Sequence, residues 1–264
     1  MSSIPTATTS KQCSGKADTR ARQAYLVDMA FSDCPIVFVP GLLCDERLWR
    51  DQRIDLADLG DTMVADVAQD DSIAGMASRL LASAPPRFRL VGLSMGGYVA
   101  FEVLRQARDR VDALALLDTT AAPDAPARAT EREATLRSVS VGKFAGVTDR
   151  LLPRLIDEQH LQGPVGEDVK AMAQRVGGDA FVRQQTAIQG RPDSRPLLGQ
   201  IGVPTLVAVG DGDVLTPPAA SVEMFRALPS PSFHLFHRCG HLPAMEQPDE
   251  TSAVLRRWLE ALPA

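Results

Sequence analysis

The residues of clearest chemical potential are 92–97, Gly-Leu-Ser-Met-Gly-Gly, which fit the pattern Gly-x-Ser-x-Gly. A serine in this pattern lies on a sharp strand-to-helix turn, where the flanking glycines prevent backbone clashes. The turn exposes the Ser94 hydroxyl at the end of the strand. The positive N-terminus of the next helix then favours negative charge developing beside it. The spacing predicts that Ser94 is a nucleophile.

A serine nucleophile needs a general base, and the chain has four histidines. His241 follows the last predicted strand in the loop Cys-Gly-His-Leu-Pro, from which it can reach the carboxyl edge of a sheet. His234 and His237 lie within that strand, and we expect His160 to face solvent. The order serine, acid, histidine along the chain therefore favours His241 as the base.

Three aspartates could orient this histidine. Asp213 is favoured because the glycines of the loop Gly-Asp-Gly-Asp let the chain turn and aim its second acid toward His241. Asp211 suits the formation of the turn itself. Asp118 ends an earlier strand and stays open as an alternative acid.

Two backbone N–H groups must hold an oxyanion in such a site. One is expected from Met95, which follows the nucleophile, and the other from Leu42, in the loop after the first buried strand. A substrate pocket is expected from neighbouring apolar side chains and one from the central helical region: Leu43, Cys44, Val214, Leu215, Leu242 and Phe144.

From residue 35 onward, short apolar runs alternate with helical patterns, which indicates an α/β fold with a mostly parallel sheet. The predicted strands are 36–39, 62–67, 88–93, 111–117, 204–209 and 232–237. Residues 119–198 contain helical patterns at 126–139, 166–176 and 179–188 but no strand, so they predict a helical cap. We expect residues 1–34 to be a disordered N-terminal extension and 35–264 to form the α/β domain.

Composition excludes several classes of protein. The chain has 264 residues and a formal net charge of −5, so no basic face for nucleic acid is expected. No apolar run is long enough to predict a membrane span. Its four cysteines lack a Cys-x-x-Cys pair, which favours reduced thiols in the cytoplasm and gives no indication of a metal site.

In these motifs the chain resembles the α/β-hydrolase superfamily, specifically small bacterial esterase- and lactonase-like members with a helical cap. The matching motifs are Pro-Gly-Leu at 40–42, the serine motif at 92–97, Gly-Asp-Gly-Asp at 210–213 and Gly-His-Leu-Pro-Ala-Met-Glu-Gln-Pro at 240–248. The resemblance implies an eight-stranded, mostly parallel sheet with the cap inserted after the sixth strand. Few residues precede Pro35 for the hairpin that opens such a sheet, and residues 27–31 could supply one short strand.

The expected function is a serine hydrolase that cleaves a carboxylic ester, or a related acyl bond, of a small molecule. It would use a Ser-His-Asp triad and an acyl-enzyme intermediate, without a metal or organic cofactor. On the same triad, the alternatives are a lactonase, a carbon–carbon bond hydrolase or a cofactor-free perhydrolase. A small-molecule receptor with slow residual hydrolysis is the alternative from another class.

Overall fold

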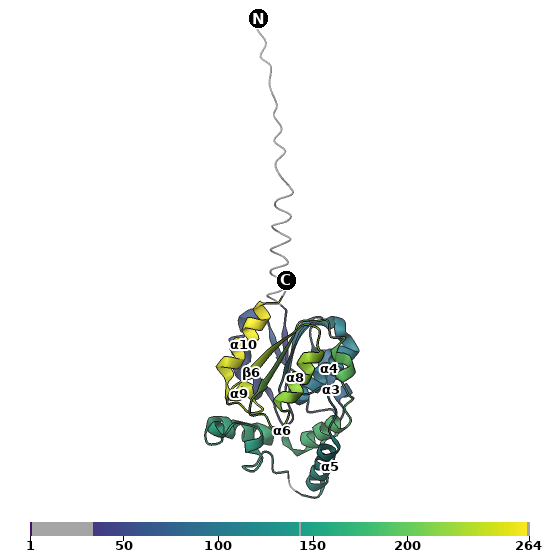
Figure 1. Ribbon diagram of the computed structural model, residues 1–264, viewed down its shortest axis with the longest axis vertical. Helices are drawn as coiled ribbons and strands as arrows, with labels where there is room; N and C mark the ends of the chain where they lie inside the picture. The colour runs from purple at the N-terminus through teal and green to yellow at the C-terminus, as the bar shows by residue number, and fades with distance from the viewer. Residues whose placement is uncertain (2–33, 143, 263–264) are drawn as a thin grey trace.

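A computed structural model describes residues 34–142 and 144–262, together with Met1. Six strands form one sheet in the order β2-β1-β3-β4-β5-β6, and every neighbouring pair is parallel. Figure 1 shows this sheet flanked by helices. The strands are β1 (Ile36–Val39), β2 (Thr62–Val64), β3 (Phe88–Leu93), β4 (Val111–Leu117), β5 (Thr205–Gly210) and β6 (Pro231–Phe236). All six predicted strands are confirmed, with small shifts at the bounds of β2, β5 and β6.

The strand count differs from the eight that the family resemblance implies. The described residues form six strands, and the helical insertion follows the fourth of these, β4, rather than the sixth. The resemblance places the missing pair ahead of β1. The candidate strand at 27–31 and most of the predicted extension at 1–34 lie outside the described residues.

Helices connect the strands in the alternation that the sequence predicts. They are α2 (Arg50–Asp55), α3 (Ile73–Ser83), α4 (Met95–Ala107), α5 (Pro126–Val141), α6 (Pro164–Gln189), α7 (Arg195–Leu198), α8 (Pro218–Ala227), α9 (Pro243–Glu246) and α10 (Pro248–Glu260). The two helices predicted at 166–176 and 179–188 are joined in α6, where Gly177 interrupts the helical backbone with a φ of 80°. No helix in the described part of the chain is long and apolar enough to cross a membrane.

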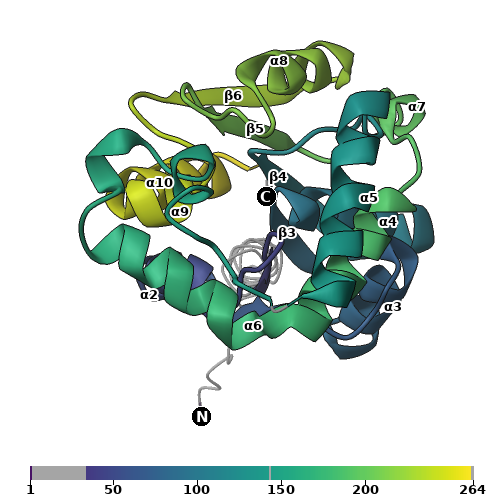
Figure 2. The ribbon, with the colours of Figure 1, turned by 90° about the horizontal axis from the view of Figure 1, so that it is seen from below.

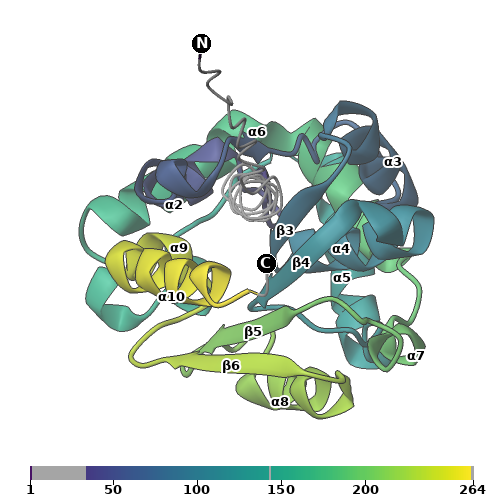
Figure 3. The same ribbon diagram turned by 90° about the horizontal axis from the view of Figure 1, so that it is seen from above.

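Both faces of the central strands β1, β3, β4 and β5 are buried, which explains the nearly continuous apolar runs of these strands. Successive side chains of β1 point to opposite faces, so Ile36 and Phe38 belong to one core and Val37 and Val39 to the other. The first core includes side chains of α10, and the second includes those of α3, α4 and α8. Figure 3 shows these two groups of helices on opposite sides of the strands.

The insertion between β4 and β5 lies beyond one end of the sheet, where α5 and α6 pack against each other (Figures 1 and 2). In parallel strands all carboxyl ends share one edge, and residues from this insertion line a pocket together with residues that follow β3 and β6. The insertion therefore covers the edge at which ligands bind in open α/β sheets.

The turn from β3 into α4 is held by close backbone contacts. Ser94, between the two elements, has a φ of 55°, a conformation that most residues avoid. A Cβ atom at Gly96 would lie 2.1 Å from the carbonyl oxygen of Val39, and one at Gly92 would lie 2.6 Å from that of Gly96. Only glycine permits this approach between α4 and the end of β1.

We predict that Gly96→Ala lowers the free energy of unfolding by about 2 kcal/mol or more, because the methyl group meets a backbone carbonyl that cannot move aside. Helix propensity alone would raise the free energy of unfolding by about 1 kcal/mol, since alanine is the better helix former. Urea unfolding followed by circular dichroism measures the change. Gly202→Ala is the control, since nothing lies within 4 Å of a Cβ placed there. Equal stability of the two variants would contradict the steric account.

Candidate active site

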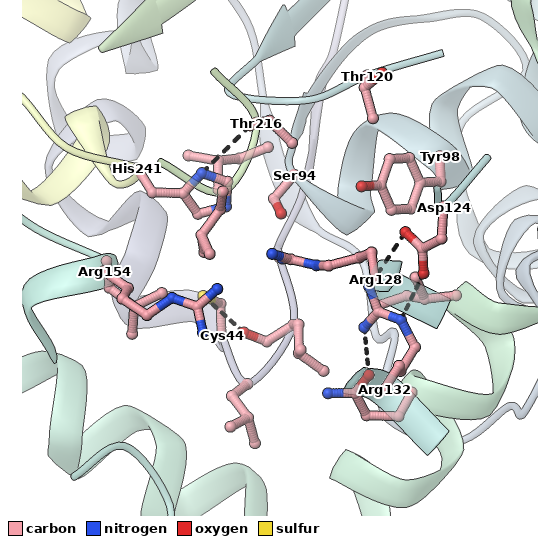
Figure 4. Close-up of a pocket in the computed structure, with 18 of the residues that line it drawn as sticks. Cys44, Ser94, Tyr98, Thr120, Asp124, Arg128, Arg132, Arg154, Thr216 and His241 are labelled. Atoms are coloured by element: carbon pink, nitrogen blue, oxygen red, sulfur yellow. Dashed lines mark hydrogen bonds and ion pairs between the residues drawn. The ribbon is translucent and has the colours of Figure 1, made fainter. Parts of the chain in front are cut away.

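The carboxyl ends of four neighbouring strands bring the predicted catalytic residues to one edge of the sheet. Ser94 follows β3, Asp118 follows β4, Asp213 lies after β5, and His241 lies after β6. Ser94 and His241 both line the pocket under the insertion, and Figure 4 shows the hydroxyl and the imidazole at the same end of it.

His241 is held by a buried carboxylate. Its Nδ1 atom lies 2.8 Å from Oδ2 of Asp213, and the two residues are 4% and 3% exposed. The Thr216 hydroxyl donates to Oδ2 at 2.6 Å, while Oδ1 accepts the N–H groups of Leu215 and Thr216 at 2.7 and 3.1 Å. Burial acts to raise the pKa of Asp213, but the imidazole and the Thr216 donors outweigh it and the pKa is lowered. The carboxylate is thus kept ionised beside the imidazole.

The other two candidate acids have different partners. Oδ1 of Asp118 accepts the Gly210 N–H at 2.9 Å, and burial, reinforced by the charge of Asp213, raises the Asp118 pKa well above its ordinary value. Asp211 contacts Nδ1 of His237 at 3.2 Å and accepts the Cys239 N–H at 3.3 Å. Of the three aspartates, Asp213 is the one whose carboxylate meets His241.

Among the residues that the structure describes, Asp118, Asp213 and His241 form a group in which a metal ion is geometrically conceivable. One ligand atom from each lies within 4.8 Å of the others. Both oxygens of Asp213, however, already accept hydrogen bonds, from Thr216 and its neighbours, and Oδ2 also meets the imidazole. This donor set suits the orientation of a histidine better than the coordination of a cation.

The loop after β1 lies against Ser94. A Cβ atom at Gly41 would be 3.4 Å from that of Ser94, which places the predicted donor Leu42 beside the turn. Met95, the other predicted donor, is the first residue of α4. The next residue of the loop, Leu43, has a φ of 59°, and its N–H donates to Oε1 of Gln184 at 3.0 Å. Because Gln184 belongs to α6, the insertion holds this loop in place.

A second buried carboxylate organises the loop that carries His241. Glu246, only 5% exposed, accepts the N–H groups of Gly240 and Leu242 at 3.0 Å each and that of Asp157 at 2.7 Å. Burial raises the Glu246 pKa, although these three donors act against the shift. Glu246 therefore joins both sides of His241 to the insertion.

The pocket has a cavity volume of about 490 Å³, within the range usual for small-molecule sites. Four of the six residues predicted to line it do so: Leu43, Cys44, Leu215 and Leu242. Many of the other apolar lining residues come from the insertion, including Val147, Leu151, Val169, Met172 and Phe181.

Val214 and Phe144 do not line the cavity, contrary to expectation. Val214 is 58% exposed because the turn directs the neighbouring Asp213 side chain inward. The ring of Phe144 packs on that of Phe181, with centroids 5.5 Å apart, so it supports the cavity wall from behind. His160, expected to face solvent, is half-buried.

Three kinds of residue at the site are not among those predicted from the sequence. Thr216 could have been found, since a threonine three residues after an aspartate often bonds to it in a turn. Gln184 acts through contacts across the fold, for which the local sequence carries no signal. Glu246 contacts the nearby residues Gly240 and Leu242 as well as the distant Asp157, and no motif used in the sequence analysis indicates these bonds. The arginines in the cavity wall, contributed mainly by α5 and the segment after it, were also missed.

The fold and this site define an α/β-hydrolase. A model of the family described as serine aminopeptidase, S33, matches residues 60–248, and the chain belongs to this family. It is accordingly a hydrolase of the α/β-hydrolase superfamily.

Curated relatives and solved structures agree with this assignment. The pimeloyl-[acyl-carrier protein] methyl ester esterase of Neisseria meningitidis serogroup C is 26% identical over 227 residues, which cover 81% of this chain and 84% of that protein. A thermophilic esterase from Thermogutta terrifontis, solved with malate bound, has a TM-score of 0.78 and 31% identity, covering 87% of this chain and 90% of that one. The enol-lactonase from Burkholderia xenovorans LB400 shares the fold, with a TM-score of 0.75, 22% identity, and coverage of 86% and 92%.

We predict that Glu246→Gln lowers the free energy of unfolding by about 2 kcal/mol or more, because the amide has one acceptor oxygen and turns an N–H toward buried N–H donors. Urea unfolding at pH 7 measures the loss. Glu250→Gln, at an exposed position paired with His234, is the control and should change stability by less than about 0.5 kcal/mol. Similar losses in both variants would contradict the role given to Glu246.

Proposed function

We propose that the protein is a carboxylic-ester hydrolase that acts through Ser94, His241 and Asp213 and forms an acyl-enzyme. The observation that carries the proposal is the 2.8 Å contact between His241 Nδ1 and Asp213 Oδ2, in a pocket that also contains the serine of a strand-to-helix turn. The esterase names of two relatives point to the same class of bond.

The first half of the reaction forms the acyl-enzyme. Because Nδ1 of His241 is engaged by Asp213, Nε2 is the nitrogen left to take the proton from the Ser94 hydroxyl. The serine oxygen attacks the ester carbonyl, and Asp213 stabilises the imidazolium that results. When the tetrahedral intermediate collapses, the C–O bond to the alcohol breaks and His241 returns the proton to the departing oxygen.

The second half releases the acid. His241 deprotonates a water molecule, which attacks the acyl-enzyme, and the proton then passes to the Ser94 oxygen as the C–O bond to serine breaks. In both halves the N–H groups of Leu42 and Met95 hold the carbonyl oxygen as it gains negative charge. One such donor is typically worth about 3 kcal/mol of transition-state stabilisation.

We also propose that the cap comprises residues 119–198 and that its apolar side chains select the substrate.

A cytoplasmic location fits the cysteines: Cys34, Cys44 and Cys239 are free thiols. Burial is the main cause that raises the pKa of Cys34 to about 11 and that of Cys44 to about 12, which keeps both thiols protonated and unreactive.

We predict that a fluorophosphonate probe labels the wild-type protein and leaves Ser94→Ala unlabelled, as read by intact-mass spectrometry. His241→Gln should label at least about 100-fold more slowly, because the hydroxyl has lost its base. His237→Gln, an exposed histidine near the same loop, should label at the wild-type rate. Equal labelling of the wild type and Ser94→Ala would contradict the nucleophile assignment. A panel of short esters and lactones then separates esterase from lactonase activity.

We predict that Asp213→Asn lowers kcat for an ester substrate by about 10⁴-fold, because the amide favours the wrong histidine tautomer. Asp118→Asn should lower it by less than about tenfold, since the amide oxygen can still accept the Gly210 N–H. Steady-state kinetics of the two isosteric variants measure the difference. The reverse order would make Asp118 the orienting acid.

A further inference from the structure

The wall of the active-site cavity carries more positive than negative charge. Its described lining contains four arginines, Arg128, Arg132, Arg154 and Arg191, and two acids, Asp124 and Glu131. A site that handled only uncharged esters would have no need for excess charge beside its nucleophile, since charges are costly to remove from water.

Three of the four arginines already have carboxylate partners. Arg132 and Arg191 both bind Asp124. Nε of Arg132 lies 2.8 Å from Oδ2 and a second nitrogen lies 3.5 Å from Oδ1, while one nitrogen of Arg191 lies 2.8 Å from Oδ1. Arg154 lies 3.0 Å from Glu131. These pairs neutralise the two acids and hold the three side chains in the wall.

Arg128 is different. Across residues 34–142 and 144–262, no carboxylate oxygen lies within ion-pair distance of its guanidinium. The side chain is half-buried, and Figure 4 shows it extended across the pocket with its guanidinium directed toward Ser94. A guanidinium held in this way presents several N–H donors in a planar fork, which matches the two oxygens of a carboxylate.

The rest of the cavity is lined mainly by apolar side chains, among them Val169, Met172 and Phe181. A ligand that satisfies both features has a short apolar stem and an anionic end. Because Arg128 reaches toward the nucleophile, the anionic end would lie only a few bonds from the ester carbonyl.

We propose that Arg128 forms a carboxylate-binding subsite and that the substrates of this enzyme are esters carrying a free carboxylate, such as half-esters of short dicarboxylic acids. The proposal rests on the function proposed above, since the subsite shares its pocket with Ser94. It specifies the charge of the substrate, whereas the proposed function specifies only the class of bond that is cleaved.

The test compares monomethyl glutarate with methyl butanoate, a neutral ester of similar length. The wild type should prefer the half-ester by at least about tenfold in kcat/KM, and Arg128→Gln should reduce that preference by about 10- to 100-fold, as expected for loss of a charged hydrogen-bonded pair. Arg137→Gln removes the same charge from an exposed position of α5 and should retain the wild-type preference. Absence of the preference in the wild type, or its retention in Arg128→Gln, would overturn the subsite.

A binding measurement separates this proposal from the proposed function. Isothermal titration calorimetry measures the affinity of Ser94→Ala for monomethyl glutarate. This affinity should be at least tenfold higher than that of Ser94→Ala/Arg128→Gln and equal to that of Ser94→Ala/Arg137→Gln. Binding that depends on Arg128, without turnover in the wild type, would support the subsite and reject the hydrolase. Turnover of both esters with no dependence on Arg128 would support the hydrolase and reject the subsite.

Discussion

The site depends on one close approach of backbone to backbone, where the start of α4 meets the end of β1. Gly96 brings the helix so near to the carbonyl of Val39 that no side-chain atom fits between them. This approach holds Ser94 in its left-handed conformation and sets its hydroxyl at the carboxyl edge of the sheet. It also brings the loop after β1, with Leu42, against the same turn. The residues proposed as nucleophile and oxyanion donors are thus positioned by a single packing constraint.

The helical insertion does more than cover this edge. Gln184 of α6 accepts the Leu43 N–H and so holds the loop that carries Leu42. On the other side, the Leu155 carbonyl accepts the His241 N–H at 2.9 Å, and Glu246 joins the histidine loop to Asp157. Both loops beside Ser94 are therefore tied to the element that lines most of the pocket. Changes in the insertion can alter the geometry of the reacting groups as well as the choice of substrate.

Local patterns were sufficient to predict the strands and the residues that follow them. The apolar runs of β1, β3 and β4 are continuous because both faces of each strand are buried, and the glycine pattern around Ser94 reflects a steric need. The cavity wall was less predictable. Val214 follows Asp213 in sequence but points outward, and Arg128 enters the pocket only through the placement of α5 over the sheet. Contacts between distant segments, such as that of Gln184 with Leu43, do not change the hydrophobic periodicity of either segment, so the sequence pattern does not predict them.

In the proposed mechanism, Ser94 attacks a carbonyl whose oxygen is held by Leu42 and Met95 while His241, oriented by Asp213, moves the proton. A crystal structure of the protein after reaction with a fluorophosphonate tests it most directly. We expect phosphorus bonded to Ser94 Oγ, with the phosphonyl oxygen within hydrogen-bond distance of the Leu42 and Met95 N–H groups and Nε2 of His241 facing Oγ. Phosphorus on another residue, or a phosphonyl oxygen directed away from both N–H groups, would contradict it.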